Sequence, residues 1–164
     1  MSDGGVHTHL ETDSRRAFLR KAMVAGGIAV GVPMVTTFNV PAAADHSAPG
    51  MYRVQFQRST SNQNSFTRVT PTDANLSTTC AGQEGAWDGA QADPGIEASL
   101  SSSNNVTIQL TGADATSCQI QSAFADGDGS CLNGTLQSGG DSVTFSRSAL
   151  ASGANIYLLV NCTA

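Results

Sequence analysis

Lysine is absent from the chain beyond residue 44. Four arginines and ten carboxylates remain there, so this part carries a formal charge of −6. Nucleic acids and anionic membrane surfaces are bound through basic patches, which an acidic chain with scattered arginines does not offer. We therefore expect neither a nucleic acid nor a membrane surface as a partner of this part.

The same part is poor in side chains that bind metals or carry redox chemistry. His46 is its one histidine, whereas copper, haem and catalytic zinc sites need two or three imidazoles. No Cys-x-x-Cys motif is present. Four carboxylates cluster without the signature of a glycosidase pair: Glu84, Asp88, Asp93 and Glu97. The sequence predicts no cofactor and no enzymatic activity, and a hydrolase with a carboxylate pair is the alternative.

No apolar run reaches the roughly 20 residues of a membrane-spanning helix. Residues 22–35 form a mildly apolar run with three glycines and a proline, behind a basic flank. This pattern is typical of a helical secretory signal peptide. Ala42 and Ala44 supply the small-residue cleavage site, so Asp45 is the predicted first residue of the mature chain. A signal that stays uncleaved as an anchor is the alternative.

The basic flank has a more specific pattern. Two arginines, one variable position and a Phe-Leu pair follow one another: Arg15, Arg16, Phe18 and Leu19. This order resembles the twin-arginine (Tat) signal of exported prokaryotic proteins. The resemblance implies that residues 1–44 engage the Tat translocase and a signal peptidase. It also implies that residues 45–164 reach the cell envelope or the extracellular space, already folded. Beyond the signal, no family resemblance is found.

All four cysteines lie in the predicted mature part: Cys80, Cys118, Cys131 and Cys162. An even number in a small exported domain predicts two disulfides. A zinc site is disfavoured. Zinc-binding cysteines come in pairs that lie two to four residues apart, whereas consecutive cysteines in this chain are 38, 13 and 31 residues apart. Three connectivities are open. The preferred one joins Cys118 to Cys131 in a local loop and Cys80 to Cys162, which ties the last strand to the first half.

Residues 45–164 predict an all-β domain. Serine and threonine make up 29 of these 120 residues, and apolar residues alternate with polar ones over 51–58, 106–110 and 141–147. The alternative is a disordered serine-rich stalk, but a disordered chain has no need for a regular two-residue alternation of apolar and polar residues. Seven to nine short strands separated by turns indicate an antiparallel β-sandwich, with an immunoglobulin-like arrangement as one form and a closed barrel as the alternative. Residues 155–162 are apolar on both faces, which predicts a central, doubly covered strand.

Smaller segments give less regular signals. A third strand is predicted over 76–80, a strand over 118–124, a turn over 125–130 and a returning strand over 131–136. Residues 81–95 have no helix or strand period and are expected to form a long loop with the only tryptophan, Trp87. Large aromatics are buried more often than displayed, so Trp87 is expected to plug the core, with a ligand-binding role as the alternative.

One turn carries oxygen ligands at alternate positions. Asp126, Asp128 and Ser130 match the opening of an EF-hand calcium loop. The pattern then fails, because Cys131 stands where a glycine is needed and Gln137 where a bidentate carboxylate is needed. An Asp- and Gly-rich hairpin turn explains the same residues without a metal. We therefore expect no metal here, and calcium is the alternative.

The function that these observations favour is a non-catalytic exported or cell-surface domain with a structural or adhesive role. The alternative is a small module that binds carbohydrate or protein through residues 81–95, with Trp87 in contact and calcium assisting. The partner of the mature domain is not predicted.

Overall fold

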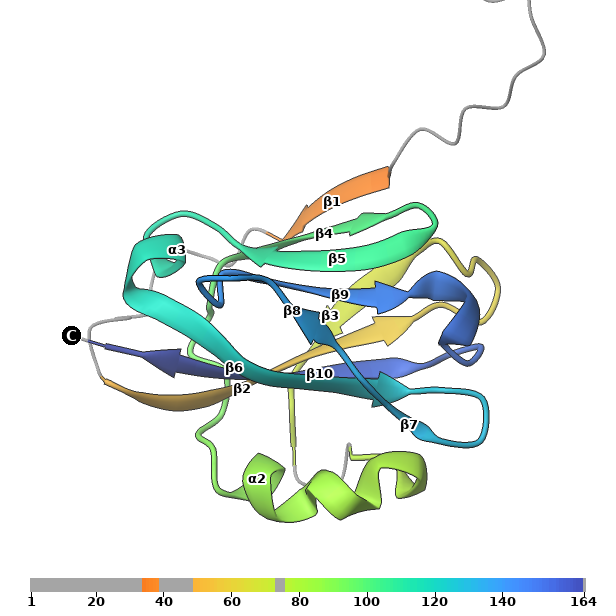
Figure 1. Ribbon diagram of the computed structural model, residues 1–164, viewed down its shortest axis with the longest axis horizontal. Coiled ribbons are helices and arrows are strands. Elements are labelled where there is room, and N and C mark those ends of the chain that lie inside the picture. The colour runs from red at the N-terminus through yellow and green to blue at the C-terminus, as the bar shows by residue number, and fades with distance from the viewer. Residues whose placement is uncertain (1–33, 39–48, 73–75, 164) are drawn as a thin grey trace, which may run out of the picture. The chain divides into compact units, whose positions relative to one another are not determined.

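The computed structural model of the chain describes residues 34–38, 49–72 and 76–163 (Figure 1). The predicted signal motif, Arg15, Arg16, Phe18 and Leu19, and the predicted cleavage site, Ala42 and Ala44, lie outside these residues, as does His46. Among the helices of the described part, none has the length and apolar character that a membrane crossing requires.

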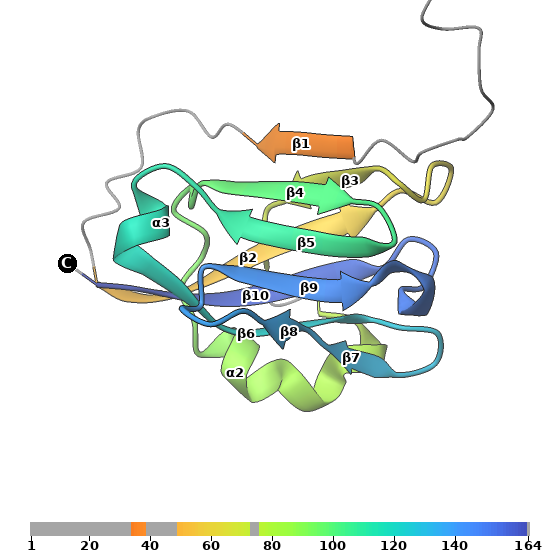
Figure 2. The same ribbon diagram turned by 45° about the horizontal axis from the view of Figure 1, so that its top comes forward.

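Two antiparallel sheets form the fold. The first contains, in spatial order, β1 (Met34–Phe38), β4 (Ala98–Ser102), β5 (Asn105–Leu110), β9 (Ser142–Ser146) and β8 (Thr135–Leu136). The second contains β3 (Phe66–Val69), β2 (Gly50–Arg58), β10 (Asn155–Cys162), β6 (Cys118–Asp126) and β7 (Cys131–Asn133). Figure 2 shows the two layers, and the prediction of an all-β sandwich is confirmed. The last strand lies in the middle of its sheet, whereas the last strand of an immunoglobulin domain lies at an edge.

The main core lies between the sheets and follows the alternation seen in the sequence. Four strands contribute every second side chain, all of them at most 5% exposed: Tyr52, Val54 and Phe56 of β2; Val106, Ile108 and Leu110 of β5; Val143 and Phe145 of β9; Ile156, Leu158 and Val160 of β10. Burial of each large apolar side chain stabilises the fold by about 1.5–3 kcal/mol before entropy is counted. The strands predicted over 51–58, 106–110 and 141–147 are therefore confirmed.

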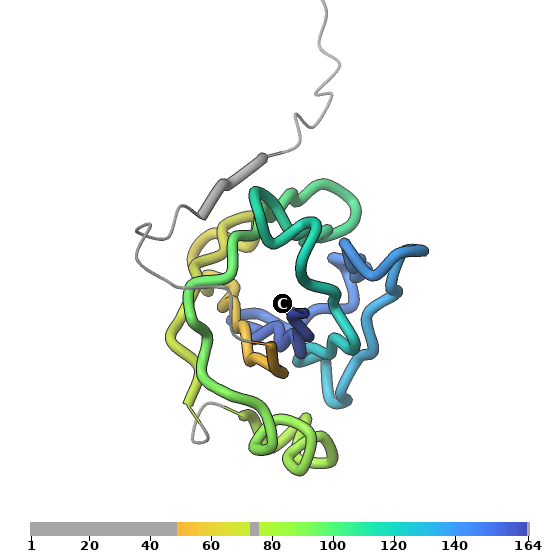
Figure 3. The backbone as a smooth tube through the Cα atoms, turned by 90° about the vertical axis from the view of Figure 1, so that its left-hand side faces the viewer, coloured from red at the N-terminus to blue at the C-terminus, as the bar shows by residue number. Residues whose placement is uncertain are grey.

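A second, smaller core lies on the outer face of the second sheet. A 3₁₀ helix, η2 (Thr78–Gln83), and a short helix, α2 (Glu84–Asp88), cover that face (Figures 1 and 3). This outer cluster consists of Cys80, Trp87, Ala90, Phe124, Tyr157 and Leu159. Tyr157 and Leu159 of β10 face it, while Ile156 and Leu158 face the main core. The predicted double coverage of the last strand is confirmed.

The third strand predicted over residues 76–80 is wrong, since this segment begins η2. Ser77 caps the helix, because its Oγ accepts a hydrogen bond from the backbone N–H of Cys80 at 3.3 Å. Serine favours such caps over strand interiors. Helical structure also extends into the segment expected to be a loop, residues 81–95, as far as Asp88. The segment is too short to show a helical period, so the sequence alone did not distinguish a short capped helix from a strand here.

The turn predicted over 125–130 is shorter, because β6 continues through Asp126. The returning strand predicted over 131–136 is split between the sheets: β7 pairs with β6, and β8 pairs with β9. Gly134 stands at the crossing. A Cβ atom there would lie 2.5 Å from Cγ2 of Val143, so only glycine permits this close approach.

Two disulfides are present, as predicted, but their connectivity differs from the preferred one. Cys80 is joined to Cys131, and Cys118 is joined to Cys162. The pairing follows from the sheet, because Cys118 and Cys162 are directly opposite in the β6–β10 register. Cys80 lies in η2, over the sheet that contains β7 and Cys131. The prediction of a local Cys118–Cys131 loop was therefore wrong, since it took sequence separation as a guide to contact.

β1 falls within residues 1–44, which were predicted to form a helical leader. Its residues 34–38 are extended and pair antiparallel with β4, with Thr36 opposite Leu100. The helical expectation is therefore not met at these five residues. Cleavage after Ala44 stays a prediction.

Candidate functional site

Trp87, the candidate ligand-binding residue, is completely buried. Its ring lies edge-on to those of Tyr157 and Phe124, with centroid distances of 5.1 and 6.2 Å. Its Nε1 donates a 3.4 Å hydrogen bond to the carbonyl oxygen of Thr72. The burial favours the core-plug interpretation and leaves no indole face for a ligand. The predicted binding loop thus lacks its aromatic contact.

Asp126, the first candidate calcium ligand, is committed to the fold. Its Oδ2 accepts 3.0 Å hydrogen bonds from both the backbone and the side-chain amide of Asn155. Its Oδ1 accepts from the hydroxyl of Ser77. Asp128 and Ser130 are exposed. In the described residues, no three His, Cys, Asp or Glu side chains gather as a metal site, so the geometry does not favour the calcium alternative.

Tyr157 is linked to the same network. Its hydroxyl accepts a 2.9 Å hydrogen bond from the backbone N–H of Ser77, next to Asp126. Burial of the phenol raises the pKa of Tyr157 above its ordinary value of 10.0, and the charge of Asp126 acts in the same direction. Hydrogen bonds from Ser77 and Asn155 oppose the rise.

This raised pKa predicts a loss of stability in alkali. Above pH 10 the unfolded chain releases the Tyr157 proton while the folded protein retains it, so the free energy of unfolding falls as the pH rises. Absorbance at 295 nm should show a phenol that titrates above pH 10 in the folded protein. Tyr157→Phe should abolish that component, and its persistence in the variant would contradict the assignment.

Three of the four clustered carboxylates lie in separate surroundings, and Glu97 is half-buried, with its backbone N–H donating a 2.7 Å hydrogen bond to Oδ2 of Asp114. Asp93 forms an ion pair with Arg68 and accepts hydrogen bonds from the backbone N–H groups of Gly95 and Ile96 at 2.9 and 3.0 Å. Glu84 and Asp88 are exposed on the short helix α2. A hydrolase would need two carboxyl groups facing each other across a cleft. Asp93 is committed to a structural ion pair, so the arrangement does not favour that chemistry.

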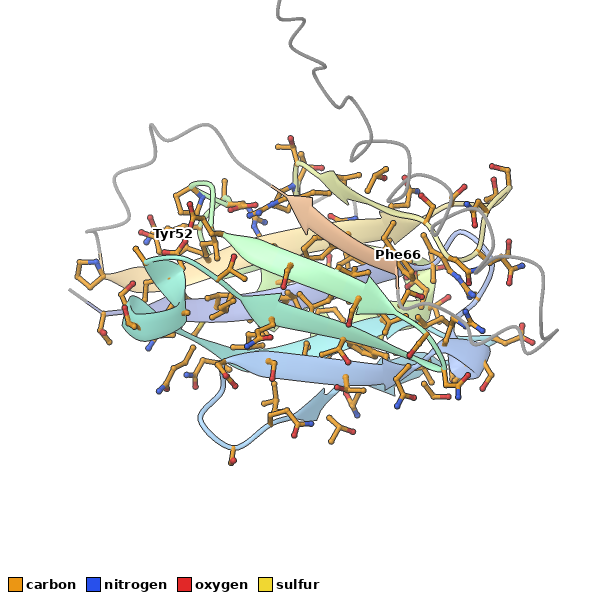
Figure 4. The ribbon with its side chains drawn as sticks, turned by 90° about the horizontal axis from the view of Figure 1, so that it is seen from above. Tyr52 and Phe66 are labelled. Atoms are coloured by element: carbon orange, nitrogen blue, oxygen red, sulfur yellow. A yellow bond between two sulfur atoms is a disulfide. The ribbon has the colours of Figure 1, made fainter. Side chains whose placement is uncertain are left out.

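A different surface brings polar groups together. A depression of about 480 Å³ is lined by residues from two loops, a 3₁₀ helix with the residue after it, and a strand end: Arg58, Gln63, Asn64, Asn104, Arg147, Ser148 and Leu150. Arg58 ends β2, and it lies opposite Phe66 in the β2–β3 register. Figure 4 labels Phe66, which marks this part of the molecule, and Tyr52 near the other end of β2.

Arg58 forms the floor of this depression and is only 5% exposed. Its Nε donates a 2.8 Å hydrogen bond to the carbonyl oxygen of Gln63, and its Nη1 donates a 2.7 Å bond to that of Leu150. Nη1 and Nη2 make longer bonds of 3.3 Å to the Ala151 carbonyl and to Oε1 of Gln63. Each of these acceptors is neutral.

Arg147 begins the 3₁₀ helix η3 (Arg147–Ala149) and is half-buried. Its Nη1 donates a 2.6 Å hydrogen bond to Oδ1 of Asn64, and its backbone N–H donates to the carbonyl of Asn104. Burial lowers the pKa of Arg58, and the positive charge of Arg147 lowers it further. The two cations therefore repel each other across the same depression.

No known protein family, curated protein or solved structure matches this chain. A function must therefore be inferred from its own residues. The sequence offered one clue to the depression, because residues 45–164 have only four arginines and two of them meet there. Their wide separation along the chain concealed it, since the β2–β3 loop and η3 meet only in the folded sandwich.

Proposed function

We propose that the protein is an exported, non-catalytic β-sandwich domain with a structural or adhesive role at the cell envelope or outside the cell. The observation that carries this proposal is the pair of disulfides, which uses all four cysteines. Disulfides are typical of oxidising compartments. The Tat-like motif at Arg15 and Arg16 supports the same location independently.

The use of the acidic side chains supports a non-catalytic role. Asp93 neutralises Arg68, and Asp126 connects Ser77 to Asn155. Asp114 is completely buried and accepts a 2.7 Å hydrogen bond from the backbone N–H of Glu97. Each of these carboxylates joins segments distant in sequence, which is the use expected in a stable scaffold.

A small binding module is the second candidate. Residues 81–95 no longer favour it, because Trp87 is buried. The depression with Arg58 and Arg147 favours it instead, since a scaffold alone gives no reason to place two cations together. A binding surface of this kind is compatible with an adhesive role.

The intact mass of the secreted protein tests export, cleavage and disulfides together. We expect a chain that starts at Asp45, lacks four hydrogens relative to the reduced mass, and does not react with an alkylating reagent until it is reduced. After reduction all four cysteines should be alkylated. A full-length mass in the cytoplasmic fraction, or free thiols before reduction, would contradict the proposal.

The matched control is a variant with Arg15→Lys and Arg16→Lys. It keeps the charge of the flank and removes the arginine pair, so it should stay inside the cell if the route is Tat. Secretion of this variant at the normal level would contradict the Tat route. It would not contradict the proposal that the domain is exported.

A further inference from the structure

We propose that the depression between Arg58 and Arg147 binds the oxyanion group, a carboxylate or a sulfate ester, of an acidic sugar. The argument starts from charge. Within the described residues neither arginine contacts a carboxylate, although this part of the chain has twice as many acidic residues as arginines. A buried cation beside a second cation is costly unless an anion joins them.

Arg58 has an extensive structural role of its own, whereas the Arg147 side chain makes one hydrogen bond, to Asn64. Arg58 connects the β2–β3 loop to the segment after η3 through four hydrogen bonds to neutral groups. That role does not need Arg147, whose positive charge disfavours the charged form of Arg58. An oxyanion between the two guanidinium groups would reverse this penalty, because both cations would then face an opposite charge.

The hydrogen-bond donors suit an oxyanion. A guanidinium group has five N–H donors, and four of those on Arg58 are occupied. Arg147 uses one donor on Asn64 and keeps the planar fork that binds carboxylate and sulfate oxygens in pairs. Arg58 then contributes its charge and one further donor from the floor, while Arg147 contributes the directional contact.

The neutral groups of the lining indicate what carries the oxyanion. Gln63, Asn64 and Asn104 offer amides, and Ser148 offers a hydroxyl, all on exposed residues. The amide oxygens of Gln63 and Asn64 accept from the two arginines, so their amide N–H groups and the amide of Asn104 are the groups that suit the hydroxyl groups of a sugar. No aromatic residue lines the depression, so an uncharged sugar would lack a stacking surface. The volume of about 480 Å³ lies within the usual range of about 300–1,000 Å³ for small-molecule sites.

This inference names a ligand for the adhesive role proposed above. It rests on that role only for where the ligand is met, and the argument for the site itself does not depend on export. Binding by the purified full-length chain tests the site, whereas the intact mass of the secreted protein tests export. The two proposals can therefore fail separately.

The experiment is a titration of the purified full-length protein, at constant ionic strength, with sodium glucuronate, glucose and sodium sulfate. Glucuronate should bind, and the Nε–Hε signal of Arg58 should shift in a ¹⁵N-resolved NMR spectrum. Glucose, which lacks the carboxylate, should not bind. Equal affinity for sulfate and glucuronate would overturn the sugar part and support a site for the free oxyanion. No shift with either anion would overturn the whole proposal.

Arg147 is the residue to replace, because it is half-buried and its removal does not open the backbone contacts of Arg58. Arg147→Gln should weaken glucuronate binding about 10- to 100-fold, the usual range for a lost charge-assisted hydrogen bond. Arg147→Lys should recover part of the loss. The control is Arg53→Gln, which changes the net charge by the same amount as Arg147→Gln. Arg53 does not line the depression, so this variant should bind glucuronate with unchanged affinity. Equal losses in Arg147→Gln and Arg53→Gln would overturn a local site.

Discussion

Replacing Cys118 and Cys162 together by alanine is expected to lower the free energy of unfolding by about 4 kcal/mol. The bond closes a separation of 44 residues, and the loss of chain entropy from the unfolded state gives this magnitude. It also joins two central strands of one sheet, β6 and β10. Urea denaturation with linear extrapolation measures the change.

A matched pair of variants tests the connectivity itself. The double variant without Cys118 and Cys162 keeps the Cys80–Cys131 bond, so it should show no reactive thiol. The variant without Cys118 and Cys131 leaves two partnerless cysteines, so alkylation should label two thiols. Labelling of the first variant and none of the second would restore the connectivity preferred from the sequence.

Trp87→Ala is expected to destabilise the protein by about 3–5 kcal/mol, the usual cost of removing a large buried aromatic side chain. The side chain is fully buried and contacts Phe124 and Tyr157, so its loss leaves a cavity in the outer cluster. Chemical denaturation followed by circular dichroism measures the effect. Glu84→Ala, an exposed change on the same helix, should stay within about 0.5 kcal/mol.

The native protein provides a second readout of the same feature. Trp87 is the only tryptophan, so its fluorescence reports this position alone. A buried indole should emit at a blue-shifted wavelength and resist quenching by iodide. Red-shifted emission with strong quenching would instead return Trp87 to the list of ligand-binding candidates.

The sheet positions were predictable where one physical rule dominated. Val54, Ile108 and Val143 alternate with polar neighbours, and a two-residue period leaves one face for the core. The last strand was also predictable, because Tyr157 and Leu159 add a second apolar face that only a covered central strand can bury.

Features that depend on contacts between distant segments were not predictable. The pairing of Cys118 with Cys162 follows from the register of β6 and β10, which a pattern of alternation does not define. The covering helices were missed because η2 begins at a local capping bond of Ser77 and is too short to show a helical period. The arginine depression was missed because Arg58 and Arg147 are far apart in the sequence and come together only when the sandwich folds.

The strand β1 occupies an edge of the first sheet, where its backbone pairs with residues 98–102 of β4. With cleavage after Ala44, β1 departs with the leader and β4 becomes the edge. Its outward N–H and C=O groups then lack partners, and an uncovered edge strand is a template for pairing with another chain. In that case cleavage moves the open edge of the first sheet from β1 to β4, so the strand available for pairing with another chain changes from Met34–Phe38 to Ala98–Ser102.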